Sequence, residues 1–143
     1  MLRAIQHLRR RKTINYFVIK YKLPSLNDYT AACRSNKYVG AKFKADVEEL
    51  IGWSIRQALT AKTLYKPKAA VMVRFEWHEK TKKRDADNIA SAKKFILDAL
   101  VNMRVLENDS RKYVKGFYDV IVDDKEDFVI VELIEIATQR NKK

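Results

Sequence analysis

The stretch YVKGFYDVIVDDKEDFVIVELIEI, residues 113–136, decides the fold class, because two segments of alternating apolar residues flank a short acidic turn. Alternation with a period of two is typical of β-strands, and DDKE, residues 123–126, has the composition of a turn. Residues 113–122 and 127–136 are therefore predicted to pair as a β-hairpin.

Strands and helices alternate in the preceding part of the chain. Strands are predicted at residues 14–22 and 66–79, and helices at residues 42–61 and about 88–103, from the spacing of their apolar residues. Pro24 and the polar residues after it predict a long basic loop between the first strand and the first helix.

The resulting order, β-α-β-α-β-β, predicts one α+β domain over residues 1–143, with a small mixed β-sheet and two main helices. Residues 136–143 are expected to form a frayed basic tail. The aromatic residues expected in the core are Trp53 on the first helix and, on the strands, Tyr16, Phe17, Tyr21, Phe75 and Trp77.

Charge is distributed unevenly along the chain. The sequence has 30 Lys and Arg against 18 Asp and Glu, a net charge of +12. Residues 1–68 carry 15 basic and 4 acidic residues, whereas residues 69–143 carry 15 and 14. Such an excess favours a polyanionic partner, because neutralised phosphates release counterions. Nucleic acid is the leading candidate, with a solvated surface, an anionic membrane face or a ribosome-like RNA contact as alternatives.

The apolar runs are too short to cross a bilayer, and the N-terminus lacks the apolar core of a signal peptide. A lone cysteine, Cys33, excludes an internal disulfide. We therefore expect a soluble protein of a reducing cytoplasm, with no membrane partner and no small-molecule cofactor.

The segment RDADN, residues 84–88, places two carboxylates one residue apart where a strand and a loop lead into a helix. Asp87 at a helix start has an ordinary structural role as an N-cap, which is commoner at such a place than a catalytic role. In an extended chain, however, side chains two apart point to the same side, so Asp85 and Asp87 have the spacing to share a hard cation. From the residues alone, both interpretations stay open.

The expected cation is Mg²⁺, with Mn²⁺ as an alternative. A calcium loop is excluded because its sixth position would be Ala90 instead of Gly and its twelfth Ile96 instead of Glu. Magnesium needs only one or two carboxylates together with water and substrate phosphate. Asp109, after the second helix, is the candidate third ligand, and Glu107 competes with it.

Three motifs in this order, RDADN, KKFILDAL and VLENDSRKYV, resemble the RusA family of Holliday junction resolvases, in particular its phage-type branch. The resemblance is strongest over residues 84–114 and extends more weakly to LPSLNDY, residues 23–29, and the closing strands. It implies a dimeric, magnesium-dependent endonuclease that nicks four-way DNA junctions symmetrically in the cytoplasm of a bacterial host. Its catalytic, metal-binding carboxylates would be Asp85, Asp87 and Asp109.

The resemblance also implies an essential lysine, which falls on Lys94 when the alignment is anchored on Asp98. This chain has about one helical turn more between Asn88 and Asp98 than the best-known family member, so Lys93 is an alternative. Lys94 would stabilise charge that develops on the phosphate, while Asn88 and Asp98 would form the outer shell of the site. The alternative for Lys94 is an ordinary surface ion pair with Asp98, which would stabilise the helix by only a few tenths of a kcal/mol.

The candidates for DNA contact are basic residues after the first strand, close to Asn27 in the turn that resembles the family's: Arg34, Lys37, Lys42 and Lys44. Arg84 and Lys93, beside the carboxylates, complete this set. An ordinary solvated loop is the alternative. The rival of an endonuclease of four-way or branched DNA is a non-catalytic nucleic-acid-binding protein, in which Asp85 and Asp87 only cap a helix.

Overall fold

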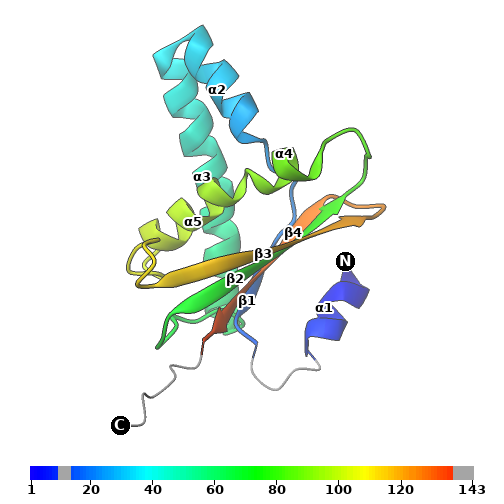
Figure 1. Cartoon of the computed structure of the whole chain (residues 1–143), viewed down its shortest axis with the longest axis vertical. Coiled ribbons are helices and arrows are strands. Elements are labelled where there is room, and N and C mark those ends of the chain that lie inside the picture. The colour runs from blue at the N-terminus through cyan, green and yellow to red at the C-terminus, as the bar shows by residue number, and fades with distance from the viewer. Residues whose placement is uncertain (10–13, 137–143) are drawn as a thin grey trace.

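The chain folds around a four-stranded sheet with helices on both of its faces (Figure 1). The computed structural model describes residues 1–9 and 14–136, without the side chains of residues 8 and 9. In chain order its elements are α1 (Leu2–Arg9), β1 (Tyr16–Ile19), α2 (Leu26–Ser35), α3 (Lys37–Ala61), β2 (Val71–Glu79), α4 (Ala86–Ala90), α5 (Lys93–Asn102), β3 (Val114–Asp123) and β4 (Phe128–Glu135). Most of the expected tail, residues 137–143, lies outside the described residues.

The sheet is mixed, as predicted, and its strand order is β1-β4-β2-β3. β2 pairs in parallel with β3 and antiparallel with β4, and β4 pairs antiparallel with β1. α4 and α5 connect the two parallel strands, since a parallel pair requires a crossover. The α+β class is therefore confirmed, whereas the predicted order lacks α1, α2 and the division between α4 and α5.

The predicted hairpin between the last two strands is wrong, because β2 lies between β3 and β4. The connection crosses the end of β2, where the Asp124 N–H donates to Glu79 O at 3.0 Å. Beyond this crossing, the Lys80 N–H donates to Asp127 Oδ1 at 2.8 Å. Alternating apolar residues identify both segments as strands but do not specify their neighbours.

α3 and α5 cover one face of the sheet and enclose the main core with it (Figure 1). Every second residue of β2 points into this core, as the burial of Val73, Phe75 and Trp77 shows. α5 contributes the buried side chains of Phe95 and Ile96. Each fully buried side chain of this kind stabilises the fold by about 1.5–3 kcal/mol. The core therefore fixes α3 and α5 relative to each other.

α1 packs on the opposite face of the sheet, and the sequence did not predict it (Figure 1). Met1 and Ile5 contact a small second cluster that contains Tyr16, Phe128 and Ile130. β4 is consequently buried on both faces along most of its length, as is typical of a central strand.

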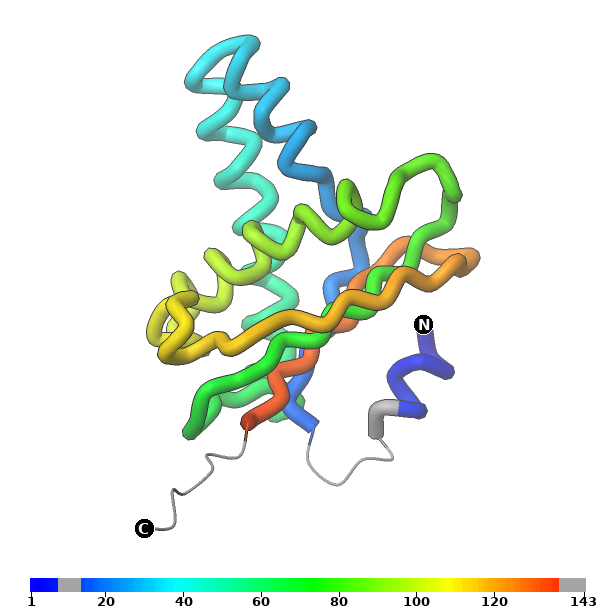
Figure 2. The backbone as a smooth tube through the Cα atoms, in the orientation of Figure 1, coloured from blue at the N-terminus to red at the C-terminus, as the bar shows by residue number. Residues whose placement is uncertain are grey.

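The predicted basic loop after Pro24 is wrong, because α2 and the start of α3 form a helical hairpin there. Ser25 Oγ accepts from the Asp28 N–H at 3.1 Å, and the Asp28 carboxylate accepts from the Ser25 N–H at 2.9 Å. This reciprocal capping box starts a helix in a segment of turn-like composition. Figures 1 and 2 show α2 and the first part of α3 projecting away from the sheet. We call residues 26–46 the helical arm.

The predicted helix at about 88–103 begins earlier and is divided into α4 and α5. Ser91 lies at the division: its hydroxyl donates to Asn88 O at 2.6 Å and accepts from the Leu26 N–H at 3.0 Å. Hydrogen bonds of this kind compete with the backbone ladder of a helix. The division thus ties the start of the helical arm to the α4–α5 segment.

Three further findings concern the core and the helices. Tyr21, expected in the core, is 49% exposed, because β1 ends at Ile19 and Tyr21 lies beyond the strand. Trp53, expected in the core, is 55% exposed, and the Arg56 guanidinium lies 5.1 Å from its ring centroid. The buried face of α3 carries Val47, Ile51 and Ile55 instead, and Trp53 lies off that face. None of the helices within the described residues combines the length and apolar composition that crossing a membrane requires.

Candidate functional site

An open hollow of about 430 Å³ lies where α3, α5 and the loop after α5 meet. Its polar lining consists of Lys44, Glu48, Lys94, Asp98, Asn102 and Asp109. We call these six residues the lysine–acid cluster. The structure thus brings together Lys94, Asp98 and Asp109, which the sequence assigned to one site.

Lys94 is the centre of this cluster. Its Nζ lies 3.0 Å from Asp98 Oδ1 and 3.2 Å from Asp109 Oδ2. The first contact is the expected i,i+4 pair, and the second joins α5 to the loop that follows it. Hydrogen bonds to Asp98 and, next, to Asp109 raise the pKa of Lys94 above its ordinary value. The ammonium is therefore charged at neutral pH, which excludes it as a general base under those conditions.

Lys93 points to a different part of the molecule. Its ammonium pairs with Asp119 on β3 and lies 4.8 Å from the ring centroid of Phe117. Of the two lysines considered for the active site, Lys94 is the one that contacts Asp109. A role for Lys93 in DNA contact stays a prediction.

Asp109 and Glu107, the two candidates for a third carboxylate, have different partners. Glu107 pairs with Lys66, and this ion pair lowers the pKa of Glu107. Asp109 contacts Lys94 within the hollow. The geometry therefore favours Asp109 over Glu107 as a residue of the candidate site.

Asp85 and Asp87 are exposed at the start of α4. Asp85, not Asp87, occupies the N-cap position, and its side chain makes no capping hydrogen bond. Asp87 lies in the first turn, where its Oδ1 accepts from the Asn88 N–H at 2.9 Å. Neither carboxylate forms an ion pair with any residue in the ranges 1–9 and 14–136. Of the two interpretations left open, the one with Asp87 as the N-cap does not hold, because Asp85 occupies that position.

The three predicted catalytic aspartates do not form one group. Among the described residues, no three or more His, Cys, Asp or Glu side chains are arranged to hold a metal ion. Asp109 instead contacts Lys94, 3.2 Å away. Metal binding by Asp85, Asp87 and Asp109 together therefore stays a prediction.

Two buried oxygen atoms near this segment lack partners. Glu79 Oε2, at the end of β2, and Asn88 Oδ1, in α4, form no hydrogen bond with any described residue. Arg84 pairs with the other oxygen of Glu79 and donates to Leu23 O at 3.1 Å, while its buried Nε has no partner among the described residues. A role for Arg84 in DNA contact stays a prediction. Unsatisfied buried oxygens are uncommon in folded proteins, and oxygen is the ligand type that Mg²⁺ prefers.

Most of the predicted DNA-contact residues lie on the helical arm. Four of them are exposed there, namely Asn27, Arg34, Lys37 and Lys42. Lys44 also belongs to the arm, but its Nζ lies 3.8 Å from Asp98 in the lysine–acid cluster. The basic residues therefore extend along a helical hairpin whose base reaches the hollow.

Glu48 belongs to the cluster although the sequence analysis did not single it out. Its carboxylate lies 3.8 Å from the Nζ of Lys44, one helical turn earlier, and 3.5 Å from the amide nitrogen of Asn102. Helical spacing links Glu48 to Lys44, but only the packing of α3 on α5 places both beside Asn102.

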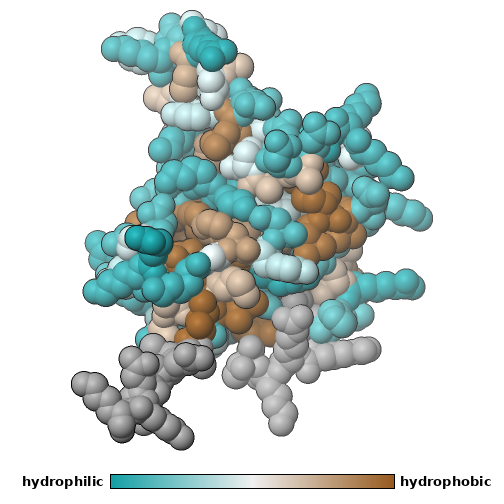
Figure 3. Space-filling model, viewed as in Figure 1, coloured by the Kyte–Doolittle hydropathy of each residue, from teal (hydrophilic) through white to brown (hydrophobic). Residues whose placement is uncertain are grey.

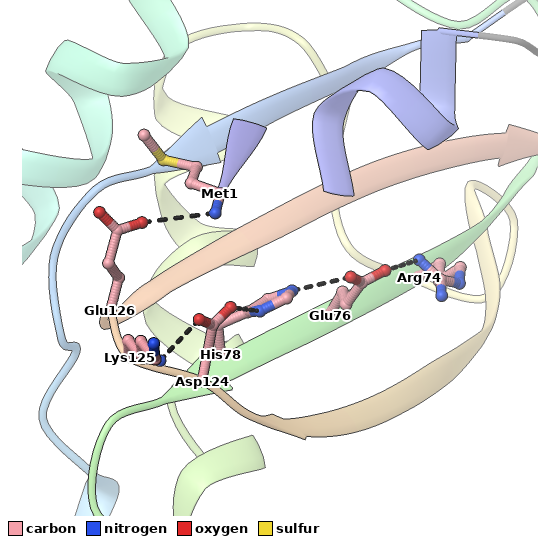
Figure 4. Close-up of polar contacts among 7 residues, drawn as sticks. All are labelled: Met1, Arg74, Glu76, His78, Asp124, Lys125 and Glu126. Carbon is pink, nitrogen blue, oxygen red and sulfur yellow. Dashed lines mark hydrogen bonds and ion pairs between the residues drawn. The ribbon is translucent and has the colours of Figure 1, made fainter. Parts of the chain in front are cut away.

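A second polar network, also missed by the sequence, lies on the opposite face of the sheet (Figure 4). The Nδ1 and Nε2 atoms of buried His78 lie 2.7 Å from Asp124 Oδ2 and 2.7 Å from Glu76 Oε1. Arg74 donates to Glu76 Oε2 at 2.7 Å. The bonds from His78 and from Arg74 hold the pKa of Glu76 down at about 2. We call Arg74, Glu76, His78 and Asp124 the sheet network.

No protein-family model matches the sequence, and no curated protein is significantly similar to it. Function is therefore inferred from the chain's own residues: their charge, exposure and contacts.

Proposed function

We propose that the protein is a magnesium-dependent, structure-selective DNA endonuclease that resolves four-way junctions. The observation that supports this best is the exposure of Asp85 and Asp87, which have no ion pair among the described residues of a chain with a net charge of +12. In so basic a chain, carboxylates gain modestly from pairing with nearby cations. Two carboxylates that lie one residue apart and have no ion-pair partner are better suited to binding a divalent cation than to a structural role.

The side chains of this segment fit Mg²⁺ or Mn²⁺ by their chemistry. Asp85 and Asp87 would hold the ion, because Mg²⁺ commonly binds one or two carboxylates and keeps several water ligands. The unpartnered oxygen of Asn88 is a further donor of the preferred type. Asp109 would join these residues only on leaving Lys94. A metal bound there supplies an acidified water and neutralises phosphate oxygens.

Lys94 would contribute a fixed positive charge. Its ammonium is held by Asp98 and Asp109, while its side chain is 54% exposed and accessible to a phosphate. Cations fixed in this way stabilise the charge that develops during phosphoryl transfer. In this proposal, Lys94 binds the scissile phosphate and Asp98 is the residue that positions Lys94.

Symmetric resolution of a junction implies a homodimer. Two nicks related by a two-fold axis need two active sites, and the described chain presents one Asp85–Asp87 pair and one lysine–acid cluster. The junction as substrate and the cytoplasm of a bacterial host as location both rest on the resemblance to the RusA family.

The rival proposal is a nucleic-acid-binding protein without catalysis. It is supported by the contact between Asp109 and Lys94, and by the lack of a metal-holding group of three side chains in the described ranges. Under this proposal, Lys94 and its two carboxylates form an ordinary surface ion-pair network.

Cleavage with and without metal separates the two proposals. End-labelled four-way, forked and linear DNA is incubated with the full chain in Mg²⁺, in Mn²⁺ and in EDTA. The endonuclease yields paired nicks in the four-way junction in either metal and none in EDTA. A protein that shifts the junction under all three conditions and cuts in none of them would overturn the endonuclease in favour of its rival.

A further inference from the structure

The helical arm is anchored at its base by aromatic rings. Tyr29 of α2, Phe43 of α3 and Phe95 of α5 pack together, with ring centroids 6.0, 5.9 and 6.4 Å apart. Phe95 follows Lys94 in α5, so the arm packs on the helix that carries the central lysine of the cluster. The direction of the arm is therefore fixed relative to the candidate active site.

The tip of the arm is a tight corner. Asn36 ends α2 and begins α3, and its Oδ1 accepts from the Tyr38 N–H at 2.7 Å. Behind this corner, a Cβ on Gly40 would lie 2.6 Å from Cys33 Sγ and 3.0 Å from Cys33 Cα. Glycine permits this close approach of the two helices because it has no side chain. Tyr38 therefore lies on a corner where α2 and α3 pack closely against each other.

The outer part of the arm is basic, although Asp46 at its base pairs with Lys42 at 3.2 Å. Residues 29–45 contain no acidic residue and four basic ones, Arg34, Lys37, Lys42 and Lys44. Arg34 and Lys37 have no ion-pair partner in the described part of the chain. Figure 3 shows hydrophilic residues over the end of the arm. A surface of this charge is complementary to a phosphate backbone.

Tyr38 is a large aromatic residue within this basic surface. It is 74% exposed, although a ring of this size normally gains free energy from burial. The Lys37 ammonium lies 5.4 Å from its ring centroid. Proteins that bind unpaired bases combine these two features, because a base stacks on the aromatic ring while the cations contact the phosphates.

We infer that Tyr38 stacks on an unpaired or unstacked base at the branch point of DNA, and that the helical arm thereby selects branched over linear DNA. The inference rests on the proposed function for its ligand, DNA, and adds the residue that recognises the branch. In a continuous duplex each base is covered by its neighbours, and exposing one costs a few kcal/mol. A branch point lowers that cost, so Tyr38 gains a stacking partner there.

The dimensions of the arm agree with this role. Lys37 and Lys44 are seven residues apart, so they share one face of α3 and lie about 10 Å apart along its axis. Lys44 in turn lies 3.8 Å from Asp98 in the lysine–acid cluster. About 10 Å equals roughly three base steps of a DNA strand. Because Lys94 lies beyond Lys44, on the other side of Asp98, Tyr38 would meet a base at least about three nucleotides from the phosphate at Lys94.

The test measures binding in EDTA, so that it does not depend on cleavage. Four-way junctions that carry the fluorescent base 2-aminopurine at successive branch-point positions, and a linear duplex of matching sequence, are titrated with the wild type, Tyr38→Ala, Tyr38→Phe and Tyr65→Ala. Tyr65 is a matched control, because it is an exposed tyrosine just beyond the opposite end of α3. Thermal unfolding verifies that each variant is folded.

Tyr38→Ala should bind the junction about tenfold more weakly than the wild type, the loss expected for one aromatic–base stack, with binding to linear DNA unchanged. The wild type, Tyr38→Phe and Tyr65→Ala should all quench one branch-point 2-aminopurine, and Tyr38→Ala should not. Absence of quenching by the wild type, or equal losses on junction and linear DNA, would overturn the role of Tyr38 but not the endonuclease. A wild type that binds neither DNA in EDTA would also overturn the role of Tyr38, while the cleavage assay in Mg²⁺ decides the endonuclease separately.

Discussion

The sheet network and the lysine–acid cluster combine the same kinds of charged side chain but differ in burial. The His78 side chain is 4% exposed, and each of its ring nitrogens has a carboxylate partner. Lys94, at the centre of the cluster, has a side chain that is 54% exposed. A buried charge without a partner costs several kcal/mol, whereas exposed charges exchange partners at little cost. The buried side chains of the sheet network are therefore expected to stabilise the fold, whereas the exposed side chains of the lysine–acid cluster are accessible to a ligand.

The sheet network also differs from the start of α4, outside the lysine–acid cluster, in how fully its carboxylates are occupied. Both oxygens of Glu76 have partners, one in His78 and the other in Arg74. Asp85 and Asp87, by contrast, have no cationic partner among the described residues. Substitutions should therefore separate the regions: those near Asp87 and Lys94 should change activity without stability, and those in the sheet network should do the reverse.

Asp87→Asn should have the largest effect and should be confined to cleavage. Asparagine keeps the shape of the side chain and its ability to accept hydrogen bonds at a helix start, but it removes a charged metal ligand. A loss of about 4 kcal/mol of transition-state stabilisation would slow junction cleavage in Mg²⁺ by roughly three orders of magnitude. Single-turnover cleavage rates, thermal unfolding and junction binding in EDTA test the three parts of this prediction.

Asp123→Asn is the matched control for that experiment, since Asp123 is an exposed aspartate that lies 4.0 Å from Lys82, outside the site. Its cleavage rate should equal that of the wild type. Near wild-type cleavage by Asp87→Asn would remove Asp87 from the active site and favour the binding protein.

His78→Leu should have the next largest effect, on stability. Leucine fills a similar volume beside Phe128 but leaves the Asp124 carboxylate, and one oxygen of Glu76, without the ring nitrogens that lie 2.7 Å away. Leaving a carboxylate without its hydrogen-bond partner costs about 1–3 kcal/mol or more, and two carboxylates lose a partner here, so we expect a loss of about 3 kcal/mol, or roughly 10 °C in melting temperature for a chain of this size. His7→Leu, at an exposed histidine, should leave the melting temperature unchanged. Loss of junction cleavage by folded His78→Leu would contradict the division between the regions.

Lys94→Met should lower cleavage by about a hundredfold, close to 2.7 kcal/mol, because one fixed cation near the developing charge is lost. Stability should change little, since the Lys94 side chain is half exposed and its ion pairs lie at the surface. Lys93→Met is the informative comparison, because Lys93 pairs with Asp119 instead of Asp109. A larger loss of cleavage in Lys93→Met than in Lys94→Met would reverse the assignment of the two lysines.

The sequence predicted the strands better than their neighbours. Side chains alternate across a sheet whichever strand lies beside them, so alternation identifies β3 and β4 but does not pair them. The apolar run of β4 is almost continuous, which is typical of a central strand, whereas β3 has many exposed residues and reads as an edge. This contrast distinguishes an edge strand from a central one, but it does not indicate that β2 lies between them.

In the candidate site, the sequence predicted contacts between residues one helical turn apart, but it did not predict contacts between residues of different helices. The pair Lys94–Asp98 follows from helical spacing and is confirmed at 3.0 Å. Lys44 reaches the same cluster only because α3 packs on α5, which no local pattern encodes. For the helical arm, Ser25 and Asp28 stand at capping-box spacing, a signal for a helix start that the turn interpretation overlooked.

The smallest expected effect is the acid dependence of the sheet network. His78 and Arg74 lower the pKa of Glu76 from 4.5 to about 2, and His78 lowers the pKa of Asp124. A carboxyl group whose pKa is lower in the folded than in the unfolded state stabilises the fold above its unfolded pKa, and this contribution disappears as the pH falls toward the folded pKa. The free energy of unfolding should therefore decrease between pH 4.5 and about pH 2, by ~1–2 kcal/mol for Glu76 after allowance for its partial exposure.

Glu76→Gln tests this assignment, because the amide keeps the shape of the side chain but does not ionise. The variant should be less stable than the wild type at pH 7, and the two should converge in stability toward pH 2, because the wild type alone loses a carboxylate there. Glu49→Gln, at an exposed carboxylate on α3, should follow the wild-type profile. Urea unfolding at a series of pH values measures all three proteins. A Glu76→Gln profile parallel to that of the wild type would show that the acid sensitivity arises in other carboxylates. Asp98 and Asp109, which pair with Lys94, would be the first of these to examine. The lysine–acid cluster would then contribute to stability as the sheet network does.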